Sequence, residues 1–433
     1  MIPVPVVAAK SISNAMGRSV EQPRIAGERS STEGTLVSEG VAGGQLGVAR
    51  AGVKQQGLDD VVVIALAPGT RTAALFTQND FRAAPVILAL KHLAFSEALP
   101  SYLLINTGNA NAGTGDAGMA AALSCCERLA ALTETPAESV LPFSTGVIGE
   151  PLPSDLIAAA LPAAIDDLRQ DNWRRASGAI LTTDTQPKLH SLEVDLAGQS
   201  CRLTGIAKGA GMVCPDMATM LSFVATDAAI DADLLDELLR AAVDASLNRI
   251  TVDGDTSTND AGTLSATGQS GVKIEAGSTQ ADQFAEALTT VMIQLAQDIV
   301  RDGEGATKFV EIRVTGGESI EACDQVGRTI AHSPLVKTAL FASDPNWGRI
   351  LAAIGRAGLS NLDTDAVSIH INGVLIAEQG ARAASYTEAQ GQAAMAAGDL
   401  IIDVALNRGH AEGVIWTTDL SYDYVKINAE YRT

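Results

Sequence analysis

The sequence predicts an α/β fold of layered sheets covered by helices, and the order of elements alone leaves an α+β arrangement open. Short apolar runs of strand length alternate along the chain with longer segments whose apolar residues recur at helical spacing. The hydrophobic content is 46% over 433 residues, which supports a folded globular protein with more than one simple core. Aromatic residues make up only 4%, so aliphatic side chains have to build that core.

The N-terminal half begins with strands and helices in alternation. Residues 59–66 and 101–106 are short apolar runs bounded by turn residues, which is typical of buried strands. Residues 83–93 and 117–132 have apolar side chains at helical spacing. These four segments therefore predict two strand–helix pairs.

A further helix is predicted over 153–168. Ser154 or Asp155 can cap its N-terminus, because both side chains accept hydrogen bonds from free backbone N–H groups. Pro162 lies inside the segment and lacks a backbone N–H. We therefore expect this helix to be kinked or divided at Pro162.

Two hairpins are predicted from short apolar runs that flank turn residues. The runs 191–197 and 201–207 are joined by a Gly-Gln turn at 198–199. The alternating segment 367–376 contains Asn-Gly at 372–373, which favours a two-residue hairpin turn. Each pair is therefore expected to form antiparallel strands.

The C-terminal half continues the alternation. Residues 231–250 and 281–300 have apolar side chains at helical spacing, and acidic residues in the first of them favour the positive helix N-terminus. Residues 308–317 alternate with the period of a strand, and 387–407 is predicted to be a helical region.

Charge and cysteine content narrow the class of protein. The formal net charge of −21 argues against nucleic acid as a partner, whereas an acidic surface can attract a cationic metabolite. Five cysteines without a C-x-x-C motif argue against a disulfide framework or a zinc site, and favour a reducing compartment. No apolar stretch reaches the roughly 18 residues of a membrane helix, so we expect no membrane span.

The N-terminal 36 residues are predicted to be an irregular extension. Their Arg and Ser with few acidic residues weakly resemble a transit peptide. We expect a cytoplasmic protein, with organelle import as the minor alternative.

Two motifs imitate ligand sites. The sequence from Gly113 to Gly118 matches the dinucleotide fingerprint G-x-G-x-x-G. In that fingerprint the glycines come directly after a strand, whereas here residues 107–112 separate them from the predicted strand 101–106. The acidic loop 253–260 resembles the start of a calcium loop, yet Leu264 stands where the bidentate Glu belongs. We therefore expect neither a nicotinamide nor a metal site, and interpret the acidic loop as a polar loop.

The pair Ala218–Thr219 has the chemistry of a self-processing nucleophile. A threonine at a chain terminus carries its own base, an α-amino group with a pKa of about 7.7–8.0. Making that terminus requires the Thr219 hydroxyl to attack the Ala218 carbonyl and form an ester that water hydrolyses. Spacing alone does not separate this reading from a threonine in a buried strand.

Nine segments in order resemble the ornithine acetyltransferase family of arginine biosynthesis, over about 44–433. They are FTQNDFRAAPV, INTGNANAGTG, STGVIGEPLP, AILTTDTQPK, GIAKGAGMVCPDMATMLSFVATDA, TVDGDTSTNDA, VRDGEGATKFVEI, FASDPNWGRILAAIGRAG and YVKINAEYRT. The resemblance implies cleavage between Ala218 and Thr219. With the extension 1–36 predicted above, this cleavage divides the chain into an α chain over 37–218 and a β chain over 219–433.

The resemblance also implies the reaction. The enzyme is expected to transfer acetyl from N-acetylornithine to glutamate by a ping-pong route through acetyl-Thr219. No metal or organic cofactor is implied, bifunctional members also use acetyl-CoA as donor, and the assembly is (αβ)2. The alternative is a self-processing aminopeptidase or amidase of the same superfamily, in which water is the acceptor. A non-catalytic dinucleotide-binding protein is the third reading.

The resemblance assigns roles to particular residues. Thr107 and Gly108 are expected to form the oxyanion hole. Lys208 is expected to pair with a substrate carboxylate, and Glu304 to face the amino group of ornithine. The substrate contacts implied as a set are Thr182, Lys208, Thr219, Glu304, Asn428 and Thr433.

Overall fold

The computed structural model describes residues 40–55, 57–95, 99–196, 198–214 and 220–430. The predicted extension 1–36, the cleavage pair Ala218–Thr219 and the substrate contact Thr433 lie outside the described residues. No helix in the described part of the chain is long and apolar enough to span a membrane.

The first sheet has four strands in the order β1-β2-β4-β5. They are β1 (Gly44–Ala49), β2 (Val61–Leu66), β4 (Tyr102–Asn109) and β5 (Val140–Val147). β4 and β5 pair in parallel, and the other pairs are antiparallel. One face is covered by α1 (Ala84–Leu93), α2 (Gly115–Thr133) and α3 (Ser154–Asp166).

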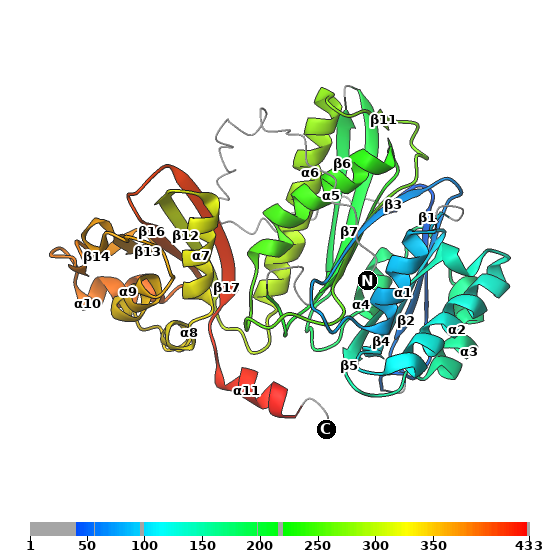
Figure 1. The fold of residues 1–433 in the computed structure, drawn as a ribbon, viewed down its shortest axis with the longest axis horizontal. Coiled ribbons are helices and arrows are strands. Elements are labelled where there is room, and N and C mark those ends of the chain that lie inside the picture. The colour runs from blue at the N-terminus through cyan, green and yellow to red at the C-terminus, as the bar shows by residue number, and fades with distance from the viewer. Residues whose placement is uncertain (1–39, 56, 96–98, 197, 215–219, 431–433) are drawn as a thin grey trace. The chain divides into compact units, whose positions relative to one another are not determined.

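The second sheet has five strands in the order β3-β10-β8-β7-β6. They are β3 (Arg71–Phe76), β6 (Lys188–Leu196), β7 (Gln199–Lys208), β8 (Leu221–Thr226) and β10 (Ala261–Ala266). Only the β8–β10 pair among these is parallel. α5 (Ala232–Ala245) and α6 (Thr279–Arg301) cover its outer face (Figure 1). Two short strands, β9 (Ala229–Ile230) and β11 (Lys273–Ile274), pair beside it.

The inner faces of the two sheets pack against each other. Val62 and Ile64 of β2 belong to the shared core, whereas Val61 and Val63 face the helices on the other side, as the period of two requires. Phe143 of the first sheet meets Phe223 of the second edge to face, with ring centroids 5.0 Å apart. The part of the chain up to α6 is therefore a sandwich of two sheets between helical layers, which confirms the predicted fold class.

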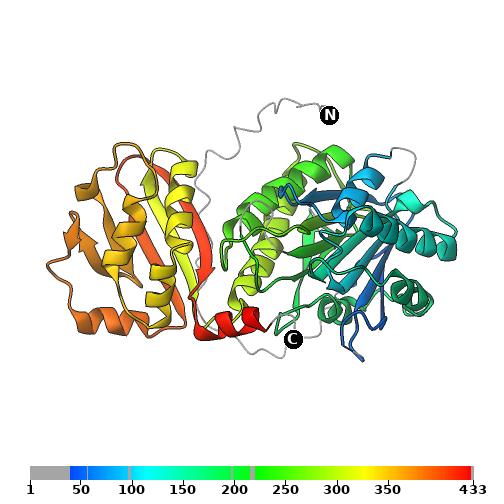
Figure 2. The same cartoon turned by 60° about the horizontal axis from the view of Figure 1, so that its bottom comes forward.

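A third sheet forms a core of its own from residue 309 onward. Its order is β15-β14-β13-β16-β12-β17. The strands are β12 (Phe309–Gly317), β13 (Ser368–Ile371), β14 (Val374–Glu378), β15 (Ala381–Arg382), β16 (Asp399–Ala405) and β17 (Ala411–Thr418). The helices are α7 (Ile320–Ala331), α8 (Pro334–Phe341), α9 (Trp347–Gly355), α10 (Glu388–Met395) and α11 (Tyr422–Ala429). Figure 2 shows α7 and α9 against this sheet.

Both predicted hairpins are confirmed. β6 pairs with β7, and the turn is one residue earlier than expected, because Gln199 already pairs with Leu196. β13 pairs with β14 through Asn372 and Gly373, which have φ values of 46° and 79°.

Predictions of local structure are wrong in two segments. The segment 154–166 is a single helix that is not divided at the exposed Pro162, and it begins after Pro153 without the predicted side-chain cap. Solvent can bond the carbonyl that Pro162 leaves free. The region 387–407 is helical only to Met395 and then forms β16, where alternating residues (Leu400, Ile402 and Val404) enter the core.

Candidate active site

The predicted oxyanion pair lies at the end of β4. Thr107 is buried, its backbone N–H donates to the Asp60 carbonyl at 2.9 Å, and its hydroxyl donates to the Ala179 carbonyl at 3.0 Å. Gly108 has a φ of 98°, and a Cβ there would lie 2.9 Å from Cγ of Lys54. Glycine is therefore required at 108 both by backbone conformation and by the close approach of the neighbouring loop.

Asp60 ties that loop to β4. Its carboxylate accepts N–H bonds from Ala51 and Val53, each at 2.6 Å, and from Lys54 at 3.1 Å. Its carbonyl accepts the Thr107 N–H described above. The buried Asp60 thus bonds both the loop that packs on Gly108 and the backbone of Thr107. Sequence reasoning missed this residue.

Lys208 and Thr182 are joined by Asp184. Lys208 ends β7 and is buried. Asp184 accepts the Gly209 N–H at 2.7 Å, the Thr182 N–H at 3.1 Å and the ammonium of Lys188 at 2.6 Å. One carboxylate therefore bonds the backbone at Thr182 and at Gly209, directly after Lys208.

Burial and charge act in opposite directions on these groups. Burial favours the neutral form of Asp184, but the ammonium groups of Lys188 and Lys208 and the Gly209 hydrogen bond leave its pKa below the usual range. Burial lowers the pKa of Lys208, and the nearby carboxylates of Asp184, Asp260 and Glu304 oppose that shift. Lys208 is thus a desolvated cation facing three acids.

Glu304 and Asn428 are hydrogen-bonded to each other next to the segment 208–211. The Glu304 N–H donates to the Ala210 carbonyl at 2.8 Å, and its buried carboxylate accepts a hydrogen bond from the Asn428 amide at 2.7 Å. Gly211 packs against that carboxylate so closely that any Cβ would collide with it. Glu304 is therefore bonded to the backbone two residues after Lys208, and Asn428 is bonded to Glu304.

The acidic loop 253–260 holds the backbone around the predicted cleavage site. Asp253 accepts the N–H groups of Met212 at 2.6 Å and Val213 at 3.0 Å, and the Tyr424 hydroxyl at 3.2 Å. Asp260 accepts the Met220 N–H at 2.9 Å, and burial raises the pKa of its carboxyl well above the usual range. Its other oxygen is buried without a hydrogen-bond partner among the described residues.

These acids bond to backbone N–H groups on both sides of residues 215–219. The described residues contain no cluster of three or more His, Cys, Asp or Glu side chains that could hold a metal ion. Asp253 and Asp260 of the loop 253–260 thus anchor the backbone before and after residues 215–219.

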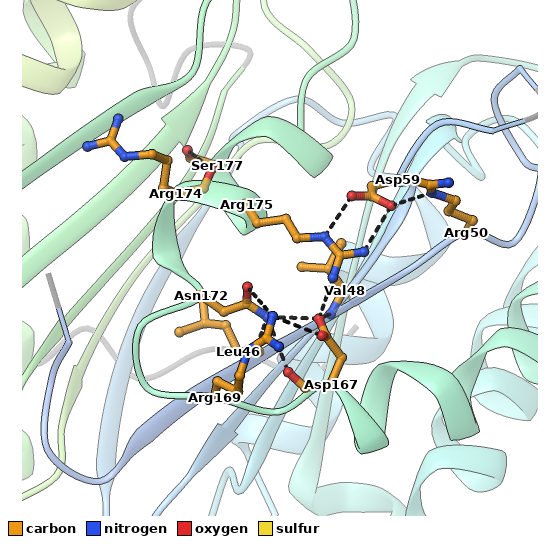
Figure 3. Close-up of polar contacts among 10 residues, drawn as sticks. All are labelled: Leu46, Val48, Arg50, Asp59, Asp167, Arg169, Asn172, Arg174, Arg175 and Ser177. Atoms are coloured by element: carbon orange, nitrogen blue, oxygen red, sulfur yellow. Dashed lines mark hydrogen bonds and ion pairs between the residues drawn. The ribbon is translucent and has the colours of Figure 1, made fainter.

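A second polar cluster joins α4 (Trp173–Ala179) to Asp59 and Asp167 (Figure 3). Asp167 accepts hydrogen bonds from the Val48 N–H, the Asn172 amide and the Arg175 guanidinium, at 3.0, 2.8 and 2.8 Å. Arg175 also bonds Asp59 at 2.9 Å. This cluster determines where the last carbonyl of α4, that of Ala179, lies.

The described site contains six of the predicted residues: Thr107, Gly108, Thr182, Lys208, Glu304 and Asn428. Ala218, Thr219 and Thr433 lie outside the described residues. Sequence reasoning missed Lys54, Asp60 and Asp184. The one signal for Asp60 was its position at the start of an apolar strand, where a carboxylate is unusual unless it is bonded.

The site therefore lies in a layered sandwich of two sheets, with buried charged side chains where a central strand begins. The model of the ArgJ family matches residues 45–433, and the chain belongs to this family.

Two relatives named "Arginine biosynthesis bifunctional protein ArgJ" are similar over most of the chain. The protein from Pseudomonas syringae pv. tomato is 53% identical over 395 residues, which cover 91% of this chain and 97% of that protein. The protein from Pseudomonas fluorescens is 54% identical over 396 residues, with the same two shares. A crystal structure of the argJ protein from Bacillus halodurans is 40% identical, covers 49% of this chain and all of that chain, and has a TM-score of 0.47.

Proposed function

We propose that this acyltransferase of arginine biosynthesis transfers the acetyl group of N-acetylornithine to glutamate and releases ornithine and N-acetylglutamate. The observation that carries the proposal is that Lys208 and Glu304 are both buried near the segment 208–211, where the Glu304 N–H donates to the Ala210 carbonyl and the Glu304 carboxylate acts on the Lys208 ammonium. N-acetylornithine presents a carboxylate and the free ammonium group of its side chain, and a buried cation and a buried anion complement these two groups. The name of the two relatives assigns them to arginine biosynthesis, in agreement with this substrate class.

The first half-reaction forms an ester on Thr219. Its hydroxyl attacks the acetyl carbonyl, the α-amino group of the same residue accepts the hydroxyl proton, and the C–N bond to ornithine breaks as that proton passes to the leaving amine. Lys208 binds the α-carboxylate, and Glu304 with Asn428 binds the amino group of ornithine. Thr182 and Thr433 complete the contacts.

Thr107 and Gly108 stabilise the negative oxygen of each tetrahedral intermediate. One such donor contributes about 2.7–4 kcal/mol to a transition state. In the second half-reaction the amine of glutamate attacks the ester, the bond to Thr219 breaks, and the hydroxyl regains its proton. No cofactor takes part in this sequence.

The nucleophile is made by self-cleavage between Ala218 and Thr219, which yields the α chain ending at 218 and the β chain 219–433. The bonds from Asp253 to Met212 and Val213, and from Asp260 to Met220, support this step because they anchor the backbone on both sides. We further propose an (αβ)2 assembly.

Acetyl-CoA is a proposed second acetyl donor, in agreement with the word bifunctional in the relatives' names. We place the enzyme in the cytoplasm, where its five buried free cysteines stay reduced.

The proposal is tested with the purified chain, N-acetylornithine and isotopically labelled glutamate. Formation of labelled N-acetylglutamate together with ornithine is expected. Release of free acetate without N-acetylglutamate contradicts the proposal and supports the aminopeptidase or amidase alternative. Replacing N-acetylornithine by acetyl-CoA in the same assay tests the second donor.

A further inference from the structure

Lys54 shares a hydrogen-bond acceptor with the oxyanion threonine. Its ammonium donates to the Ala179 carbonyl at 3.1 Å, and the Thr107 hydroxyl donates to the same oxygen at 3.0 Å. Ala179 is the last residue of α4, so its carbonyl is among those that the helix leaves without an internal partner. A cation is favoured at that negative end of the helix.

The stem of Lys54 also packs on the second member of the pair. Its Cγ would lie 2.9 Å, and its backbone nitrogen 3.1 Å, from a Cβ at Gly108. Lys54 therefore contacts the backbone of Gly108 with its stem and reaches the acceptor of Thr107 with its ammonium.

Other residues fix the position of the Lys54 backbone and of the Ala179 carbonyl to which its ammonium donates. Asp60 bonds the Lys54 N–H and, through its carbonyl, the Thr107 N–H. Arg175 bonds Asp59 and Asp167, which fixes α4 and hence the Ala179 carbonyl (Figure 3). The position of the Lys54 ammonium is thus determined by fixed elements.

Lys54 lies among the charges of the site. Burial lowers its pKa to about 8, the acids Asp60, Asp184 and Asp59 oppose that shift, and the Lys208 ammonium adds to it. The ammonium form, which donates to Ala179, is therefore stabilised by three nearby carboxylates.

We propose that Lys54 is a positioning residue for the oxyanion pair. When an oxyanion forms, the Thr107 hydroxyl has to turn from the Ala179 carbonyl to the new negative oxygen. Lys54 continues to bond that carbonyl, so the turn leaves no buried acceptor without a partner. This inference rests on the oxyanion role of Thr107 and Gly108 in the proposed function.

Lys54→Met keeps the stem and removes the donor. We expect kcat for acetyl transfer to fall roughly 10- to 100-fold, with KM for N-acetylornithine within about twofold of the wild-type value, because only the transition state is affected. Self-cleavage should slow by a similar factor, since it uses the same pair. Lys54→Arg, which retains a donor, should restore most of kcat.

The exposed lysine Lys91 of α1 provides the matched control, and Lys91→Met should change neither rate. A higher KM with unchanged kcat in Lys54→Met would overturn the inference, as would equal losses in Lys54→Met and Lys54→Arg. If Lys54→Met does not fold, as judged by its melting temperature, the Arg variant decides, because a low kcat in a folded Arg variant also overturns it. A wild-type chain without transfer activity would instead refute the proposed function.

Discussion

Residues 40–304 and 309–418 differ in how they use buried charge. The first region buries Asp60, Lys188, Lys208, Asp227, Asp260 and Glu304. The second region is described throughout, and Lys337 is its one buried charged side chain. Since burying a charge costs free energy unless it is paired and hydrogen-bonded, this contrast needs an explanation.

The two regions differ in whether the buried charged groups have hydrogen-bonding atoms without a partner. Lys337 is surrounded by acceptors, the Thr417 hydroxyl at 3.1 Å, the Thr418 hydroxyl at 3.3 Å and the Thr418 carbonyl, so its three protons are all bonded. Asp260 retains a buried oxygen without a partner among the described residues. Perturbed groups with unused bonding capacity are typical of functional sites, and fully bonded ones are typical of structural support.

The largest expected effect is on the carboxylate that joins the buried lysines. Asp184→Asn leaves Lys188 with one fewer counter-charge and removes the acid that faces Lys208. We expect the free energy of unfolding to fall by about 3–5 kcal/mol, measured by urea denaturation. Asp236→Asn, which breaks an exposed pair with Arg240, is the control and should cost less than about 1 kcal/mol. Equal losses of unfolding free energy in the two variants would contradict the claim that the buried charges of the site contribute more to stability than exposed ion pairs do.

The next effect is on substrate binding. Glu304→Gln removes the anion but can still accept the Asn428 hydrogen bond. We expect kcat/KM for N-acetylornithine to fall about 10- to 100-fold, the value of a hydrogen bond to a charged group, with little change in melting temperature. A loss of melting temperature that accounts for all lost activity would make Glu304 a structural acid like those outside the site.

Lys337 tests the other side of the comparison. Lys337→Met leaves the acceptors of Thr417 and Thr418 without a donor, so the free energy of unfolding should fall by about 1–3 kcal/mol. The kcat of the folded variant at low temperature should equal that of the wild type. A fall in kcat beyond twofold would show that the second region takes part in catalysis.

The smallest effect is a pH dependence at Asp260. Burial raises the pKa of its carboxyl above the value in the unfolded chain, so its contribution to stability is fully present below the unfolded pKa and declines as pH rises through the folded pKa. Asp260→Asn can still accept the Met220 N–H and does not ionise. The variant and the wild type should therefore unfold at similar denaturant concentrations near pH 4, and the variant should become the more stable one as pH rises. A constant difference across that range would contradict the assigned burial effect.

The sequence predicted the elements better than their charged contacts. Strands such as β2 and helices such as α6 follow from apolar periodicity, which is a local property. β16 was missed because the Ala-rich segment before it has a helical pattern that ends only at Gly398.

Lys54 could not be predicted because its ammonium bonds Ala179 of α4, which is distant in sequence. The position of Asp60 before an apolar strand gave no sign that its carbonyl bonds Thr107 of β4. The site residues themselves came from the family resemblance. Nothing in the sequence indicates that Glu304 bonds the carbonyl of Ala210, two residues after Lys208.

Mass spectrometry of the enzyme with N-acetylornithine in the absence of glutamate tests the central claim most directly. We expect a C-terminal fragment that begins with Thr219, carries one acetyl group on that residue and loses it when glutamate is added. An active preparation in which the bond between Ala218 and Thr219 is intact, or in which acetyl resides on another residue, would contradict the account.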